Sequence, residues 1–302
     1  MHMTSRLPSA CFPLLLLAPP VAVGVLAAVG MSPPLALTLT VVVLIAVLSG
    51  LEQLLPFRKD WQSTARRETA TDVVYIALAS VPDRLTRIVI EAAAVAVLGL
   101  SASATDSASQ PLVQTALLAL LAFVLADLGK YLIHRASHSL PVLWRFHLAH
   151  HQPSRLSALN ALRLHPVNMA YNAAIDTVPL LLFGVSPAIA AVIAALRATV
   201  GVLQHANLDL ETGRQWLVNA PSYHRNHHDV DVNAANHNFA STLLVWDRLF
   251  GTLRRAPTPT LVGVAPTSHR LPVGYLGQTL YPWCGDRLDT SCVLARFRWL
   301  VR

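Results

Sequence analysis

The chain has 302 residues, of which 54% belong to the set Ala, Val, Ile, Leu, Met, Phe, Trp, Tyr and Cys and only 13% are charged. A water-soluble globule of this length needs about twice that charge to cover its surface, so the composition argues against a soluble enzyme, a disordered chain and a coiled coil. It favours an integral membrane protein, in which a net charge of +7 more often sets topology than binds nucleic acid.

The first two apolar runs predict a helical hairpin. Residues 8–30 and 35–51 each approach the ~20 residues that a bilayer requires, and Ser32-Pro33-Pro34 forms a turn between them. A basic start before an apolar run is also typical of a signal peptide. Here the run is too long and a second follows at once, so residues 1–55 are predicted as a retained transmembrane hairpin that serves as an anchor.

Three further apolar stretches follow. Residues 71–100 are predicted as one span kinked at Pro82, and residues 112–133 as the next clear span. Residues 172–204 are interrupted by charged and turn-forming residues, and each half is short for a full span. Because histidines flank this stretch on both sides, the chain is expected to leave and return on one face, as a short or re-entrant hairpin.

These elements predict an all-α integral membrane protein: a bundle of helical hairpins with a cytoplasmic, histidine-rich helical cap that holds a dinuclear metal site. Residues 56–256 are predicted to form a second domain, which contains further membrane helices and nearly all the histidines, and residues 257–302 a cytoplasmic tail. Basic residues occur in the 58–67 loop and after Lys130, whereas the turns at 31–34 and 101–110 carry none. The positive-inside rule then places both termini and the histidine region in the cytoplasm.

Histidine is the informative residue type. Of thirteen histidines, only His2 and His269 lie outside residues 134–237. On an α-helix, positions i, i+3 and i+4 share a face, so each histidine box can aim its rings at one point. These boxes are His134 with His138, His147 with His150 and His151, and His224 with His227 and His228.

A metal explains this spacing better than packing does. Protonated rings packed together repel one another, and neutral buried rings without partners pay a desolvation penalty. Nine histidines exceed the about four ligands of one zinc and match two sites of four to five ligands. Imidazole suits iron, zinc, copper and nickel alike. The predicted ligands are His134, His138, His147, His150, His151, His205, His224, His227 and His228.

Five other residues are candidate ligands or candidates to orient a ligand: His165, Asp127, Tyr131, Asn207 and His237. Asp127 and Tyr131 extend the His134–His138 stripe along one helix face, so the Asp127 carboxylate is predicted to accept an imidazole N–H. His165 is open between the two roles, and His237 is expected at the surface.

Other site classes lack their motifs. The chain contains no HExxH, GxSxG, P-loop or GxGxxG sequence, so a zincin protease, a serine hydrolase and a nucleotide-binding enzyme have no support. A histidine-rich metal transporter, or a metal-binding protein without oxidase activity, remains the alternative. A transporter would place its ligands inside the spans, near the bilayer midplane.

The boxes and their surroundings resemble the fatty acid hydroxylase / sterol desaturase superfamily of membrane di-iron oxygenases. The resemblance runs from about Asp127 to Thr252, although Ala240 stands where the family usually has Gly. Its motifs are Asp127…Tyr131…His134-Arg135, Asn160…Arg163-x-His165-Pro166, His205-x-Asn207, Pro221…His224-x-x-His227-His228, Asn238-Phe239 and the closing segment Trp246–Thr252.

The resemblance implies two iron ions, which zinc can replace in a purified protein, and O2-dependent hydroxylation or desaturation of a lipid. Sterols, fatty acyl chains and isoprenoids all fit this class. No flavin, haem or iron–sulfur motif is present, so an external donor such as cytochrome b5 or ferredoxin is implied. Four arginines beside the boxes are expected either to dock an acidic carrier or to contact anionic headgroups. They are Arg135, Arg145, Arg155 and Arg225.

Overall fold

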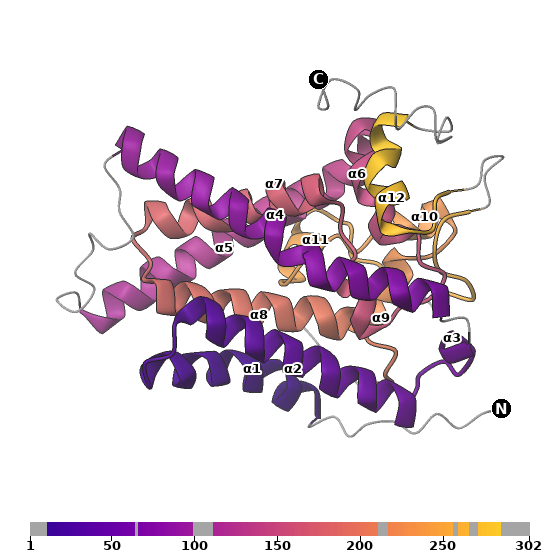
Figure 1. The fold of residues 1–302 in the computed structure, drawn as a ribbon, viewed down its shortest axis with the longest axis horizontal. Coiled ribbons are helices and arrows are strands. Elements are labelled where there is room, and N and C mark those ends of the chain that lie inside the picture. Colours follow the sequence, from indigo (N-terminus) through magenta and orange to yellow (C-terminus); the bar gives the residue numbers. More distant parts are fainter. Residues whose placement is uncertain are drawn as a thin grey trace, which may run out of the picture.

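The computed structural model describes residues 11–63, 66–98, 111–210, 217–255, 259–265 and 271–284. These ranges contain helices and isolated β-bridges but no β-strand (Figure 1). Six long helices form the body: α1 (Cys11–Ala28), α2 (Pro33–Leu54), α4 (Arg66–Leu98), α5 (Leu112–Ser139), α7 (Pro166–Leu182) and α8 (Pro187–His205). The short elements are α3 (Asp60–Ser63), α6 (Pro141–His151), η1 (Ala158–Leu162), α9 (Pro221–His227), α10 (Val232–Ala235), α11 (Val245–Leu249) and α12 (Tyr275–Cys284).

Both predicted hairpins are present, but α8 is long enough to cross a membrane, so the expectation that each half of the second hairpin is short was wrong for α8. The α1–α2 turn contains Gly30 with φ +95°, and the α7–α8 turn contains Gly184 with φ +62°. Left-handed backbone at these positions favours glycine, and a proline then begins each following helix. Both turns lie at one end of the bundle, on the left in Figure 1, while α6, α9, α10 and α12 form a cap at the other end.

Four of the described helices are long and apolar enough to cross a membrane: α1, α2, α5 and α8. Their outward side chains are large and apolar, as Val21 and Val43 illustrate, which suits contact with lipid. Helix α4 runs unbroken through Pro82 and falls outside this group because it carries several charged residues. The protein is thus a multi-pass, all-helical membrane protein, as the sequence predicts.

The long helices pack in two layers that the α7–α8 hairpin joins. Helix α8 packs against α1 and α2, and α7 packs against α4 and α5. Gly129 permits the close approach of α5 to α7, because a Cβ there would lie 2.8 Å from Cγ2 of Ile175. The N-terminal hairpin shares a hydrophobic core with α8 and η1, so it is more than the anchor expected from the sequence.

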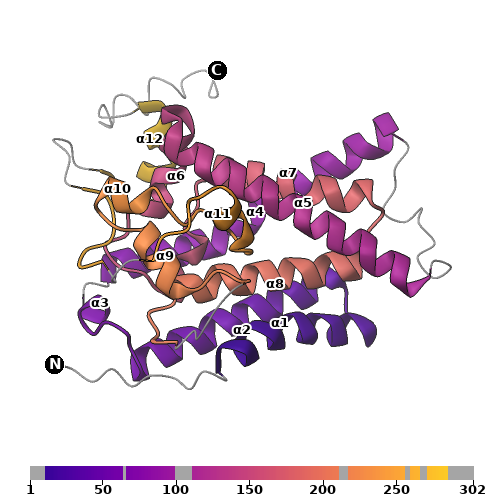
Figure 2. The same ribbon diagram turned by 180° about the vertical axis from the view of Figure 1, so that it is seen from behind.

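Helix α5 continues past the predicted end at Ile133 and therefore carries His134 and His138 on the same rigid element. The segment 236–252, which contains α11, lies along this end of α5 (Figure 2). Leu243 N and the Trp246 indole Nε1 both donate to Asp127 Oδ2 at 3.0 Å. One turn farther on, the Tyr131 hydroxyl lies 2.9 Å from the Thr252 hydroxyl.

Candidate metal centre

All nine predicted histidines converge in two adjacent groups at the cap end of the bundle. The ring nitrogens that each group offers lie within 4.8 Å of one another. The five-histidine group consists of His134, His138, His147, His151 and His227. The four-histidine group consists of His150, His205, His224 and His228. The groups touch, because the rings of His151 and His228 stack with their centroids 4.2 Å apart.

The three-histidine boxes divide between the groups instead of each serving one point, which differs from the sequence prediction. His147 and His151 enter the five-histidine group, whereas His150 enters the four-histidine group. Successive residues on a helix point about 100° apart, so His150 and His151 cannot face the same ion, while positions four apart nearly align. The second box divides in the same way and sends only His227 to the five-histidine group.

Outer partners fix the rings of the five-histidine group. His134 Nδ1 lies 2.7 Å from the Phe239 carbonyl oxygen, and His227 Nδ1 lies 2.8 Å from the His237 carbonyl oxygen. His147 Nδ1 lies 2.9 Å from Asn168 Oδ1. An N–H that donates to a carbonyl oxygen puts the proton on Nδ1 and leaves a lone pair on Nε2. The lone pairs of these rings therefore point inward.

In the four-histidine group, His205 at the end of α8 has an outer partner of the same kind. His205 Nδ1 lies 3.0 Å from Oδ1 of Asn160 in η1, and the same amide oxygen accepts from N of Ser157, the N-cap of η1. His205 Nε2 lies 2.8 Å from His224 Nε2, which in turn lies 3.1 Å from His228 Nε2. The ring nitrogens of this group also converge on one space.

The donor set fits a pair of metal ions. Nε2 atoms of His134 and His227 are buried and have no hydrogen-bond partner among the described residues. His147 and His151 approach Nε2 to Nε2 at 3.1 Å, a distance at which two lone pairs repel unless a cation lies between them. Two groups, one of five and one of four imidazoles, match the coordination numbers expected for two ions.

Burial keeps the rings of the cap histidines neutral, with one ring nitrogen free of a proton. Burial lowers the pKa of His147 to about 3. Burial, reinforced by neighbouring imidazoles, lowers the pKa of the other cap histidines well below the ordinary value: His150, His151, His224, His227 and His228. Neutral imidazole is the form that binds metal, so the cluster is ready to accept cations at neutral pH.

The other predicted site residues lie outside both groups. Asp127 does not contact a histidine, and its carboxylate instead holds the 236–252 segment. Tyr131 stacks on Phe250 with centroids 5.1 Å apart and has the same role. Asn207 accepts from Arg58 N and donates to Arg58 O, which fixes the loop after α2. Long-range partners of this kind leave no local pattern in the sequence.

The two open histidines are also accounted for. His165 is the N-cap of α7, where its Nδ1 accepts from Val167 N at 3.0 Å and its Nε2 lies 2.9 Å from Thr279 O. It therefore neither joins a histidine group nor orients one. His237 contributes its backbone carbonyl to His227, and its ring is not a member of either group; the ring is half-buried and not at the surface as expected.

Several residues that support the site carried no assigned role in the sequence analysis. Asn168, Asn160 and Asn236 contact the outer nitrogens of His147, His205 and His138, respectively. The buried Glu52 of α2 accepts from Ala158 N and Asn207 N, both at 2.8 Å. Asn160 belongs to a motif quoted above, but spacing alone does not indicate which ring it meets.

The four arginines beside the boxes fall into two classes. Arg155 is buried and pairs with Asp72 at 3.2 Å, and Arg225 is buried over the Phe57 ring at 3.8 Å. Burial lowers the pKa of Arg225 to about 10, so it remains charged at neutral pH. Neither can dock a carrier or meet a headgroup, which corrects that expectation. Arg135 and Arg145 are exposed.

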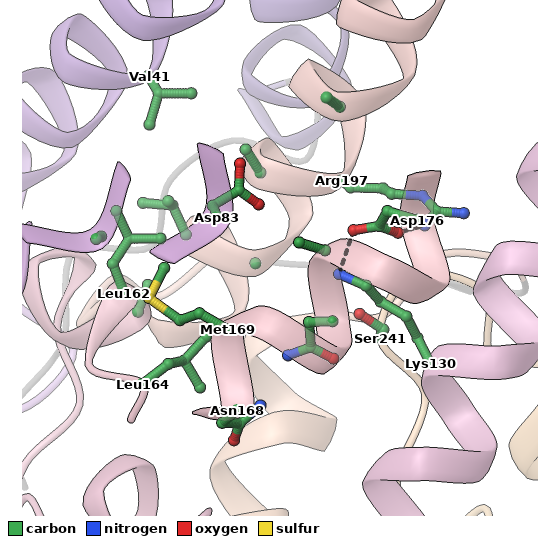
Figure 3. A pocket seen from close by; sticks show the side chains of 18 of the residues that line it. Val41, Asp83, Lys130, Leu162, Leu164, Asn168, Met169, Asp176, Arg197 and Ser241 are labelled. Carbon is green, nitrogen blue, oxygen red and sulfur yellow. Dashed lines mark hydrogen bonds and ion pairs between the residues drawn. The ribbon is translucent and has the colours of Figure 1, made fainter. Parts of the chain in front are cut away.

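A cavity of about 610 Å³ connects the histidines with the bundle interior. Its walls come from α2, α4, α5, α7 and α8, so both layers line it. Side chains of His134, His147, His150, His205 and His224 form one boundary. Leu162, Leu164 and Met169 line another part (Figure 3). A space of this size, shape and lining suits part of a lipid.

Comparison with known proteins identifies relatives of this arrangement. Residues 119–252 match the fatty acid hydroxylase family. The chain is 30% identical over 246 residues to ornithine lipid hydroxylase of Rhizobium tropici, covering 79% of this chain and 73% of that protein. It is 29% identical to alkylglycerol monooxygenase of Danio rerio, covering 55% and 37%, and 28% identical to human cholesterol 25-hydroxylase, covering 46% and 52%. No solved structure matches the chain with significance.

Proposed function

The chain belongs to the fatty acid hydroxylase family of membrane lipid hydroxylases, and on this basis we propose that it is a di-iron monooxygenase that hydroxylates an amphiphilic acyl lipid. The observation that carries the proposal is the pair of histidine groups at the end of a lipid-sized cavity. When bound, two iron ions supply the reductive activation of O2 that oxidation of an unactivated C–H bond requires. Overall, one C–H bond becomes C–OH, and O2, two electrons and two protons leave one water.

The residues of this chain would hold the two irons and keep water away from them. The nine histidines are the proposed ligands, and Asn168, Asn160 and the carbonyl of Phe239 keep three of their rings in the metal-binding tautomer. Buried packing of Ala240 and Leu244 behind the cap helps to exclude water from the rings. The apolar walls of the cavity position the lipid carbon at the histidines without extracting the lipid into water.

Hydroxylation is favoured over desaturation because the relatives named above are hydroxylases and a monooxygenase. An acyl lipid is favoured over a sterol because the match to ornithine lipid hydroxylase covers most of both chains, whereas the match to cholesterol 25-hydroxylase covers about half of each. We place the cap and both termini in the cytoplasm, since the basic residues Arg58 and Lys59 directly precede α3 at the cap end (Figure 1) and the hairpin turns opposite lack positive charge.

Metal analysis and lipid profiling test the proposal together. The purified chain is expected to bind about two irons, and a host that expresses it with a compatible reductase is expected to accumulate a hydroxylated acyl lipid, with ornithine lipids examined first. Chelation should abolish the activity and added ferrous iron should restore it. Stoichiometric zinc, with no oxidation by a reduced carrier after iron loading, would favour the metal-transport or metal-storage alternative.

The exposed arginines at α5 and α6 are the proposed docking site for an acidic electron carrier such as cytochrome b5 or ferredoxin. Arg145 neighbours Trp144, whose ring lies 5.2 Å from that of His138 and 5.4 Å from that of His151, centroid to centroid. An electron delivered at this face therefore arrives beside the five-histidine group.

Charge reversal tests this face. Arg145→Glu should lower the second-order rate constant for reduction by an acidic carrier about tenfold at low salt, and the difference should shrink as salt rises. Lys59→Glu, the same reversal at an exposed residue after α2, is the matched control and should have little effect. Equal rates for both variants would place the carrier elsewhere.

A further inference from the structure

The charged side chains in the cavity wall pair with one another. Lys130 of α5 lies 2.8 Å from Asp176 of α7, and Arg197 of α8 pairs with the other oxygen of the same carboxylate (Figure 3). Asp127 of α5 also attracts Arg197. The remaining charged residues of the lining, Asp83 and Arg87, form a two-point ion pair of 2.9 and 3.1 Å. Among the described residues, the cavity wall therefore offers no free charge to a ligand.

Two neutral amides in the same wall, by contrast, have no partner. Gln204 of α8 lines the cavity and is 7% exposed, and its Oε1 is enclosed without a hydrogen bond to any described residue. Its Nε2 also lacks such a bond but is not enclosed, so this N–H₂ is the part of the amide that a ligand can reach. Asn172 of α7 lines the cavity, is half-buried and likewise makes no hydrogen bond to a described residue. Burying an amide without a partner is costly, and a ligand in the cavity supplies the missing bond.

Helix register places the two amides in one stretch of the wall. Arg197 and Asp176 pair across the α7–α8 interface, so these two positions mark the same level of both helices. Asn172 precedes Asp176 by four residues and Gln204 follows Arg197 by seven, spacings that keep each amide on the face of its ion-paired neighbour. Because α7 and α8 form an antiparallel hairpin, both amides lie on the cap side of the ion pair, by about 6 and 10 Å along the helix axes.

This neutral stretch lies between the ion pairs and the histidines. Gln204 directly precedes His205, a member of the four-histidine group. Asn172 follows Asn168 by one helical turn, and Asn168 Oδ1 lies 2.9 Å from Nδ1 of His147, a member of the five-histidine group. A lipid group held by the two amides is therefore close to both histidine groups.

We propose that the amide N–H groups of Gln204 and Asn172 donate hydrogen bonds to an acyl carbonyl oxygen of the lipid substrate, in an ester or an amide linkage. This inference rests on the proposed function and adds that the hydroxylated carbon lies within a few bonds of that carbonyl. Neutral donors suit a neutral acceptor. A pure hydrocarbon would leave both amides without partners, and a carboxylate would find no free cation in the ion-paired part of the wall.

Competition binding without turnover tests the proposal. A fluorescent fatty acyl methyl ester bound to the purified full-length protein is displaced by methyl hexadecanoate, by hexadecanoate, or by octadecane, which has the same chain length as the ester but no carbonyl. After correction for partition into detergent, the ester should bind about fivefold more tightly than octadecane, the factor expected for one net hydrogen bond. The carboxylate should bind no more tightly than the ester. Equal affinity for ester and octadecane, or a preference for the carboxylate, would overturn the proposal.

Gln204→Met separates binding from structural support, because methionine removes the amide but keeps a side chain of similar length. The affinity for the ester should fall about fivefold, while the affinity for octadecane stays unchanged. The melting temperature of the unliganded protein should stay the same or rise, since an unpaired buried amide is removed. Loss of both affinities together with a lower melting temperature would show that Gln204 supports the fold and would overturn the proposal.

Two further variants complete the test. Asn172→Leu should also weaken binding of the ester and spare octadecane. Gln53→Met, the same change at an exposed glutamine of α2 outside the cavity, is the matched control and should leave the binding of all three ligands unchanged. Iron content is measured on the same preparations. A wild type that prefers the ester but binds no iron would support this inference and contradict the proposed function.

Discussion

Replacing His150 or His227 by alanine should reduce lipid hydroxylation by more than about 100-fold, since loss of an outer partner of a ligand alone costs 10–100-fold. His150 is one of only four rings in its group, and the His227 Nε2 is buried without any other partner among the described residues. Each substitution removes a ligand from one group only. Bound metal should therefore fall from about two ions per chain toward one, measured by elemental analysis of the purified protein.

His237→Ala is the matched control for this experiment. It removes a histidine ten residues from His227, but the contact between them uses the His237 backbone carbonyl, which alanine retains. Activity and metal content should stay within about twofold of wild type. His269→Ala is also expected to be silent from its isolation in the sequence, although it lies outside the described residues. Equal losses in all variants would indicate general misfolding.

The second large effect is expected at Asp247, which holds the 236–252 segment in shape. Its carboxylate accepts from Phe239 N and Ala240 N at 2.8 Å and from the Thr252 hydroxyl at 2.7 Å. Asp247→Asn presents an amide N–H₂ to one of these donors, which leaves buried polar groups unpaired at a cost of about 3 kcal/mol. Because the Phe239 carbonyl orients His134, iron affinity should also fall about 10–100-fold.

Thermal denaturation in detergent and iron titration measure the two parts of this prediction. Asp231→Asn is the control, since Asp231 is an exposed helix cap and asparagine caps helices equally well. It should leave both the melting temperature and the iron affinity unchanged. A normal melting temperature together with normal iron binding in Asp247→Asn would show that the segment is held by its apolar packing instead.

Local patterns in the sequence predicted the long apolar helices and the histidines that the structure brings together. Apolar runs predicted the first hairpin, because burial in a bilayer depends on composition over ~20 residues. The second hairpin was predicted from the histidines that flank residues 172–204 on both sides. Histidine spacing predicted a set of nine that the structure brings together as five and four. The division of each three-histidine box between the two groups was not predicted. It follows from the about 100° rotation about the helix axis between successive residues such as His150 and His151.

The partners of the ligands could not be predicted, because they come from distant parts of the chain. Asp127 shares a helix face with His134, and local geometry favoured a contact with a histidine. In the structure, Trp246 and Leu243, more than a hundred residues later, take that carboxylate. The same limit applies to Asn168 and to the Phe239 carbonyl, whose roles depend on how α7 and the 236–252 segment pack. Ala240 adds no strain at the family's usual glycine position, since its φ is not positive.

The contact between α5 and the 236–252 segment also imposes an order on biosynthesis. The ribosome synthesises His134 about a hundred residues before Phe239. The His134 ring therefore has no Phe239 carbonyl partner until that later segment has been translated. At the usual translation rate of ~5–20 residues per second, His134 and His138 lie at the membrane surface for several seconds before Phe239 has been synthesised. The His134 ring of the five-histidine group is therefore oriented only after Phe239 has been synthesised, and a chain truncated before Phe239 should insert its helices yet bind metal more weakly at that group.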